Sequence, residues 1–140
     1  SAGQSIPALW ADQVTRSPDA PAVTFDGDTF SYREIDEASD RLAHRLVGHG
    51  ARHGRYVALL FPRSADAVVA ILAVLKTGAA YVAIDPAYPD ARIDFMLADA
   101  APVAVVMTAD LRPATAYIHA VPSVLALAIS VSRAPGSVAR

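Results

Sequence analysis

Three carboxylates stand close together in the sequence, and a pair of carboxylates can serve as general acid and general base. They are Asp36, Glu37 and Asp40. The surrounding pattern is helical, and helical geometry spreads these three positions over a solvated face near Arg33 and Arg41. We therefore interpret the carboxylates as surface charges and not as a catalytic pair.

Two histidines in a glycine-rich stretch have a spacing that zinc ligands use on helices. His49 and His53 stand four positions apart, but Gly48 and Gly50 break any helix between them, and no third ligand is evident. The glycines superficially resemble a dinucleotide-binding fingerprint. They precede a predicted strand instead of following one, so no helix N-terminus faces a phosphate. We interpret this stretch as a helix stop followed by a loop.

The remaining candidates have simpler explanations. Ser64 lacks the Gly-x-Ser-x-Gly turn and a plausible histidine base, so it is predicted to cap a helix. Trp10, Tyr81 and Tyr88 are predicted to be core aromatics and not a ligand platform. The sequence therefore assigns no catalytic residue, no cofactor-binding residue and no metal ligand.

The N-terminal third of the sequence predicts a helix, a hairpin and a second helix. Residues 6–16 are amphipathic, and residues 22–25 and 29–32 are short extended runs joined by an Asp-Gly-Asp turn. The pattern Ser31-x-x-Glu34 is a capping box that starts the second helix. The apolar residues of that helix fall on one face: Ile35, Ala38, Leu42 and Leu46.

The rest of the chain alternates strands and helices. Residues 56–61, 81–84 and 103–107 are apolar and predict three strands. The first should be covered on both faces, and the second is expected to be short and buried. Residues 65–76 predict a helix that is apolar nearly all round, and Asp90 is expected to cap another helix. The fold class is therefore α/β, with a mostly parallel sheet, right-handed crossovers, flanking helices and an N-terminal β-hairpin.

Composition narrows the function classes. Hydrophobic residues make up 54% and charged residues 19% of 140 residues, compared with about 45–50% and about 25% in average proteins. A piece cut from a larger core would show this excess, although an Ala- and Val-rich composition without structural meaning would also show it. The net charge of −2 favours neither nucleic acid nor an anionic membrane as partner. There is no cysteine, which fits a cytoplasmic protein. The longest apolar runs are too short to span a bilayer.

Residues 76–89 (KTGAAYVAIDPAYP) join a helix end to a strand and then to a rigid turn. This stretch closely resembles an early core motif of the amino-acid adenylation domains of nonribosomal peptide synthetases. Four further segments resemble that family in the expected order, and they are residues 17–23, 29–35, 38–43 and 54–58. Residues 85–100 resemble the peptide-synthetase branch more than the acyl- or aryl-CoA ligases of the same superfamily.

The resemblance covers residues 9–110, so we divide the chain into residues 1–112, an N-terminal segment of an adenylation domain, and residues 113–140, a divergent or truncated tail. Two departures are small. Ala83 stands where the family often has proline, and Ser39-Asp40 stands where Ala-Asn is usual. Neither position belongs to the chemistry of the family.

The resemblance implies part of the large lobe of an adenylate-forming enzyme. The intact enzyme is expected to use ATP and Mg²⁺ to activate an amino acid. It would then pass the acyl group to the phosphopantetheine thiol of a carrier domain. The phosphate-binding loop of the family, which ends in Pro-Lys-Gly, and its C-terminal catalytic lysine have no counterpart here, and Lys76 is the only lysine. The fragment alone is therefore predicted to be inactive.

Two other interpretations stay open. The chain could be a non-catalytic remnant that acts as an interaction module, with an orphaned apolar face that could also self-associate. It could instead be a small, unrelated nucleotide-binding α/β domain. The amino acid that the intact enzyme activates is not determined by these residues.

Overall fold

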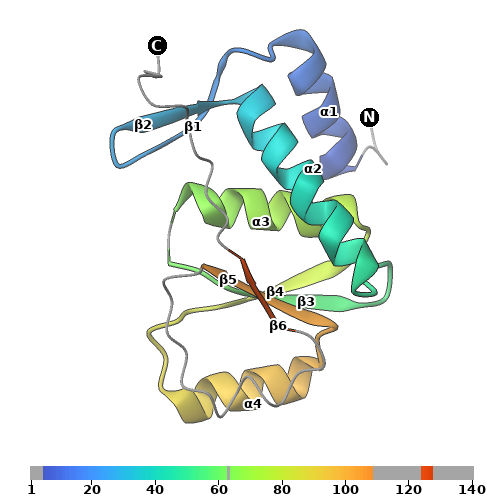
Figure 1. Cartoon of the computed structure of the whole chain (residues 1–140), viewed down its shortest axis with the longest axis vertical. Helices are drawn as coiled ribbons and strands as arrows, with labels where there is room; N and C mark the ends of the chain where they lie inside the picture. Colours follow the sequence, from blue (N-terminus) through green and yellow to red (C-terminus); the bar gives the residue numbers. More distant parts are fainter. Residues whose placement is uncertain (1–4, 63, 109–123, 128–140) are drawn as a thin grey trace.

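The computed structural model describes residues 5–62, 64–108 and 124–127, and it is built in layers. A four-stranded parallel sheet lies between α3 (Ala65–Lys76) and α4 (Asp90–Ala100). A further layer, made of α1 (Ile6–Arg16), α2 (Tyr32–Gly48) and a β-hairpin, packs on the outer side of α3 (Figure 1). The predicted α/β class with flanking helices and an N-terminal hairpin is confirmed.

The hairpin is formed by β1 (Pro21–Phe25) and β2 (Asp28–Ser31), which pair antiparallel. Its two turn residues, Asp26 and Gly27, have φ of 51° and 80°. Two successive positive φ values are typical of a type I′ turn, whose twist matches that of the flanking strands. The Asp-Gly pair suits this turn because glycine adopts positive φ without steric cost.

The capping box at the start of α2 is present as predicted. The Glu34 amide donates to Ser31 Oγ at 3.1 Å, and the Ser31 amide donates to Glu34 Oε1 at 2.9 Å. The predicted apolar face of α2 is also confirmed, because all four of its residues are buried: Ile35, Ala38, Leu42 and Leu46. This face seats α2 on α3 and fixes the outer layer to the sheet.

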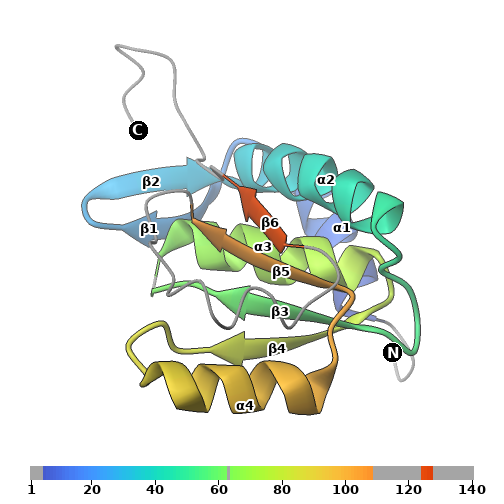
Figure 2. The same ribbon diagram turned by 60° about the horizontal axis from the view of Figure 1, so that its bottom comes forward.

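The sheet contains β3 (Tyr56–Leu60), β4 (Ala80–Ile84), β5 (Ala104–Thr108) and β6 (Val124–Leu127), in the order β4-β3-β5-β6. The chain moves outward from β3 to β4 through α3 and then returns across β3 to β5 through α4. Since the direction reverses, two crossovers of the same hand must place their helices on opposite faces. Figures 1 and 2 show α3 and α4 on opposite faces. The last strand, β6, lies within residues 113–140, where the sequence predicted no element.

The central strands are buried on both faces. Val57 and Leu59 of β3 point into the cluster under α3, whereas Ala58 and Leu60 point into the cluster over α4. Alternate residues of β5 divide in the same way. This double burial explains why these strands are continuous apolar runs without a polar alternation.

The prediction that β4 is buried is wrong. Only Ile84 of this strand is buried, and Ala80, Tyr81 and Ala83 are exposed. The physical reason is that β4 is the outer strand of the described sheet, so one flank has no neighbouring strand among the described residues. The apolar run at residues 81–84 therefore predicted a strand correctly, but it did not predict that most of the side chains of this strand are exposed to solvent.

The predicted cap of α4 is also wrong. The N-cap is Pro89, no side chain caps this helix, and Asp90 is already its first residue. The Pro89 carbonyl accepts hydrogen bonds from the amides of Arg92 (2.9 Å) and Ile93 (3.1 Å). The helix begins one residue earlier than predicted because the proline ring fixes its own φ near the value required there.

We expect Ser31→Ala to lower the free energy of unfolding of the chain by about 1 kcal/mol, since it removes the hydroxyl that accepts the Glu34 amide. Urea unfolding followed by circular dichroism measures this change. Ser17→Ala is the matched control, because the Ser17 hydroxyl makes no hydrogen bond within the described residues. Equal stability of the two variants would contradict the structural role of the capping box.

Candidate functional site

A hollow of about 450 Å³ lies at the carboxyl ends of β3 and β4, the position at which parallel α/β sheets commonly bind ligands. Residues from both strands, from α3 and from the loop after β4 line it: Leu59, Phe61, Pro62, Ala67, Ile71, Ala83, Ile84, Asp85 and Tyr88. Most of these side chains are apolar, so the lining of the hollow suits an apolar group.

The loop after β4 is held by its own hydrogen bonds. Asp85 Oδ1 accepts from the Ala87 amide at 2.9 Å, and the Asp85 carbonyl accepts from the Tyr88 amide at 3.1 Å. The Arg92 guanidinium lies 4.1 Å from the centre of the Tyr88 ring, a cation–π contact. The Asp85 carboxylate therefore shapes the turn, and the Arg92 cation is directed onto an aromatic face.

The chemistry of this hollow does not fit ATP. Its described lining carries one carboxylate and no lysine or arginine. A triphosphate needs cationic or backbone amide donors, and a nearby carboxylate opposes its binding. These residues therefore do not favour a small independent nucleotide-binding domain.

A second hollow, of about 270 Å³, lies between the hairpin and the start of α3. Asp26, Asp28 and Asp66 line it together with Ser64, whose hydroxyl accepts the Ala67 amide at 3.3 Å and caps α3 as predicted. Within the described residues no group of three or more His, Asp or Glu side chains could hold a metal ion. The three carboxylates oppose an anionic ligand.

A network of polar side chains connects α1, α2 and α3. The Lys76 ammonium donates to Asp36 Oδ1 (2.7 Å), Asp40 Oδ1 (2.6 Å) and Ser39 Oγ (2.8 Å). Trp10 Nε1 donates to the same Asp36 oxygen at 2.9 Å. One ammonium thus ties the end of α3 to α2, and through Asp36 the tryptophan of α1 joins the same network.

The interpretation as a solvated surface charge is therefore wrong for Asp36, whereas Asp40 is exposed as predicted but pairs with Lys76. The Lys76 side chain is 16% exposed, and those of Asp36 and Asp40 are 26% and 55% exposed. Both carboxylates turn toward the ammonium because α2 packs along α3, which a helical-wheel argument on α2 alone could not reveal. Both carboxylates bond to one cation, and neither lines any of the three hollows formed by the described residues, which favours a structural role for the pair.

The glycine-rich stretch behaves as predicted. His49 is the C-cap residue of α2, and Gly50 and Gly54 have φ of 97° and 86° in the loop that leads to β3. Positive φ at these positions explains the glycines without a phosphate. The two histidines are exposed, and they belong to a helix end and a loop, not to one helical turn.

The three aromatic residues that were predicted to lie in the core differ in their burial. Trp10 is half-buried, with its ring 5.2 Å from that of Tyr32, and Tyr88 is half-buried beside the cluster over α4. Tyr81 is 39% exposed on the outer strand, so the prediction that it is a core residue is wrong. Sequence reasoning also missed the exposure of Phe95 (70%) and Tyr56 (47%).

Comparison with known proteins identifies the family. The model of the AMP-binding enzyme family matches residues 10–137. The chain therefore belongs to this family, and the predicted adenylate-forming resemblance is confirmed. None of the described helices is long and apolar enough to cross a membrane.

Two curated relatives are synthases. The chain is 62% identical over 108 residues to the isonitrile lipopeptide synthase of Mycobacterium tuberculosis, and this match covers 77% of the chain and 4% of that protein. It is 53% identical over 90 residues to surfactin synthase subunit 3 of Bacillus subtilis, a match that covers 64% of the chain and 7% of that protein. The chain is thus a short fragment relative to these proteins.

The fold has solved counterparts. An o-succinylbenzoate coenzyme A synthetase from Bacillus subtilis, solved with AMP, superposes with a TM-score of 0.72 at 23% identity. The superposition covers 81% of this chain and 30% of that one. At this identity the likeness shows the fold alone, and it agrees with part of the large lobe of an adenylate-forming enzyme.

We expect Lys76→Met to lower the free energy of unfolding by about 2–3 kcal/mol, because it leaves Asp36 and Asp40 facing each other without their cation. The value is below that of a fully buried pair because Asp40 is partly solvated. Urea unfolding measures it. Lys76→Arg is the matched control, since it keeps the charge and should cost less. A Lys76→Met variant as stable as the parent chain would show that the network contributes no stability.

Proposed function

We propose that this chain is the N-terminal, non-catalytic part of the amino-acid adenylation domain of a nonribosomal peptide synthetase. The observation that carries the proposal is the 62% identity to a peptide synthase. It is supported by the segment from Lys76 to Pro89, which forms the helix end, strand and turn that the resemblance implies. The segment acts as scaffold for chemistry carried by other parts of the polypeptide.

The activity proposed for the intact enzyme follows from the weak electrophilicity of a carboxylate. Reaction of an amino acid with ATP forms an acyl-adenylate and releases pyrophosphate, which gives the carboxyl carbon a good leaving group. The thiol of a carrier-bound phosphopantetheine then displaces AMP. Both steps need neutralisation of phosphate charge by Mg²⁺ and by cationic or amide donors. The described lining of the strand-end hollow carries no lysine or arginine for that purpose, so we propose that these residues take part in neither step.

We infer that the partners of this segment are the remainder of its adenylation domain and a carrier domain, and that it works in the cytoplasm. The absence of cysteine is in keeping with that compartment. We assign no catalytic, cofactor or metal role to its residues. Residues 1–112 remain our proposed adenylation segment and residues 113–140 the proposed tail.

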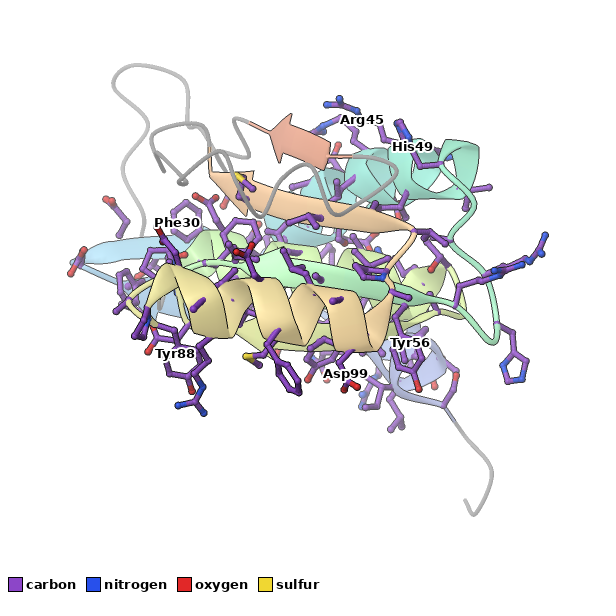
Figure 3. All side chains as sticks on the ribbon, turned by 90° about the horizontal axis from the view of Figure 1, so that it is seen from below. Phe30, Arg45, His49, Tyr56, Tyr88 and Asp99 are labelled. Atoms are coloured by element: carbon purple, nitrogen blue, oxygen red, sulfur yellow. The ribbon has the colours of Figure 1, made fainter. Side chains whose placement is uncertain are left out.

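A second function, as an interaction module, is favoured by one observation. A hollow of about 310 Å³ beside the outer strand is lined by side chains of β3, β4 and α4: Tyr56, Val82, Phe95, Met96, Asp99 and Ala100. Tyr56 and Asp99 lie at the same end of the molecule in Figure 3. We propose that the rest of the domain covers this face and that the isolated chain can self-associate through it.

We expect the purified 140-residue chain to give no amino-acid-dependent ATP–pyrophosphate exchange, because no described residue is placed to hold the phosphates. A longer polypeptide in which the same residues are followed by the rest of the adenylation domain should give exchange with one amino acid. Exchange by the chain alone above the rate without amino acid would overturn the scaffold role. No exchange by the longer polypeptide with any amino acid would overturn the proposed activity.

We also expect Phe95→Ser to weaken self-association of the isolated chain about tenfold or more, because each copy loses a large exposed apolar side chain. Sedimentation velocity over a concentration series measures the change. Val47→Ser is the control, since Val47 is 58% exposed on α2 and does not line the hollow. Equal weakening by both substitutions would argue against this face.

A further inference from the structure

A group of exposed cations lies within one stretch of the sequence. It consists of Arg41, Arg45 and His49 of α2 together with Arg52 and Arg55 of the loop that leads to β3, and we call it the basic stripe. All five side chains are exposed. Arg45 and His49 point away from the sheet in Figure 3. The stripe plays no part in the scaffold role, because none of its side chains enters the core.

The charge of the chain is segregated around this stripe. The sequence contains no Asp or Glu between Asp40 and Asp66. Since the formal net charge is −2, the remaining residues carry a surplus of carboxylates. Glu37 precedes Arg41 by four residues in the orientation that favours a helical ion pair, yet no residue of the stripe forms an ion pair within the described part of the chain.

The geometry of the stripe is repetitive. Arg41, Arg45 and His49 follow one another at intervals of four residues, which places them along one edge of α2 at steps of about 6 Å. The negative end of the helix dipole accounts for one or two cations in the last turn of α2. It does not reach Arg52 and Arg55, which stand beyond the helix.

We propose that the basic stripe binds an acidic helical face on another domain of the same synthetase polypeptide. The identity of the polypeptide rests on the proposed function, and the chemistry of the partner rests on the stripe. Every strong cation in it is an arginine, and the guanidinium is the side chain that pairs with carboxylates in a bidentate geometry at interfaces. Carboxylates spaced one helical turn apart on the partner would match the steps along α2.

Other anions fit less well. Side chains spread over two turns of α2 and a loop cannot converge on a single phosphate. Nucleic acid presents a longer row of phosphates, but its binding draws on the long-range positive field of the whole protein. The surplus of carboxylates elsewhere on this chain weakens that field, whereas short-range pairing with a protein carboxylate does not depend on it.

The first test uses the synthetase polypeptide that carries this segment. The stripe variant is Arg41→Glu with Arg45→Glu, and the control is Arg16→Glu with Arg33→Glu, which changes the net charge equally at the end of α1 and the start of α2. Amino-acid-dependent pyrophosphate exchange should stay within about twofold of the parent in both. Peptide formation should fall about tenfold in the stripe variant alone. Equal rates of peptide formation in the two variants overturn the inference. A parent without exchange overturns the proposed function instead.

The second test identifies the partner chemistry with the purified chain. One probe is a helical peptide with glutamate at every fourth position, and its control has the same composition with the glutamates distributed around the helix. We expect the first peptide to bind about tenfold more tightly at low salt, and the stripe variant to remove this preference. Equal binding of the two peptides overturns the proposal. Tighter binding of a single-stranded oligonucleotide, or saturable binding of inorganic phosphate, also overturns it, in favour of the other anion.

Discussion

The contact on which the arrangement of the helices depends is the one that Lys76 makes with Asp36 and Asp40. The ammonium lies at the end of α3 and bonds to α2 at 2.7 Å and 2.6 Å, and Trp10 of α1 bonds to the same Asp36 oxygen. Apolar packing of the buried face of α2 brings these helices together. The ion pairs from Lys76 of α3 to Asp36 and Asp40 of α2 are directional, and they favour one register of α2 along α3. The only lysine of the chain is thus used for architecture.

That use of Lys76 is consistent with the role that we propose for this segment, as scaffold within an adenylation domain. The doubly wound sheet places the loops after β3 and β4 at one edge, which is where such sheets hold ligands. The described residues at that edge are apolar or acidic, and the Arg92 cation is directed onto Tyr88. The described part of the segment therefore presents an apolar edge and a support for it. Under the proposed function, the groups that neutralise phosphate lie in other parts of the polypeptide.

Local sequence signals predicted the elements well, because each carried a definite physical cause. The Asp26-Gly27 turn, the Ser31–Glu34 capping box and the cap at Ser64 were all readable from residue types and spacing. What failed depended on contacts between distant elements. The position of β4 at the edge of the sheet depends on strand order, which an apolar run does not encode. The partner of Asp36 stands forty residues away and could not be read from one helix.

The central claim is that this chain supplies framework and no phosphate-binding chemistry. The most direct measurement is an isothermal titration of the purified chain with Mg-ATP. The account predicts no saturable heat up to about 1 mM nucleotide, which corresponds to a binding free energy weaker than about −4 kcal/mol. A saturable isotherm with a Kd well below that concentration, abolished by a substitution at the strand-end hollow such as Ala83→Trp, would contradict the claim.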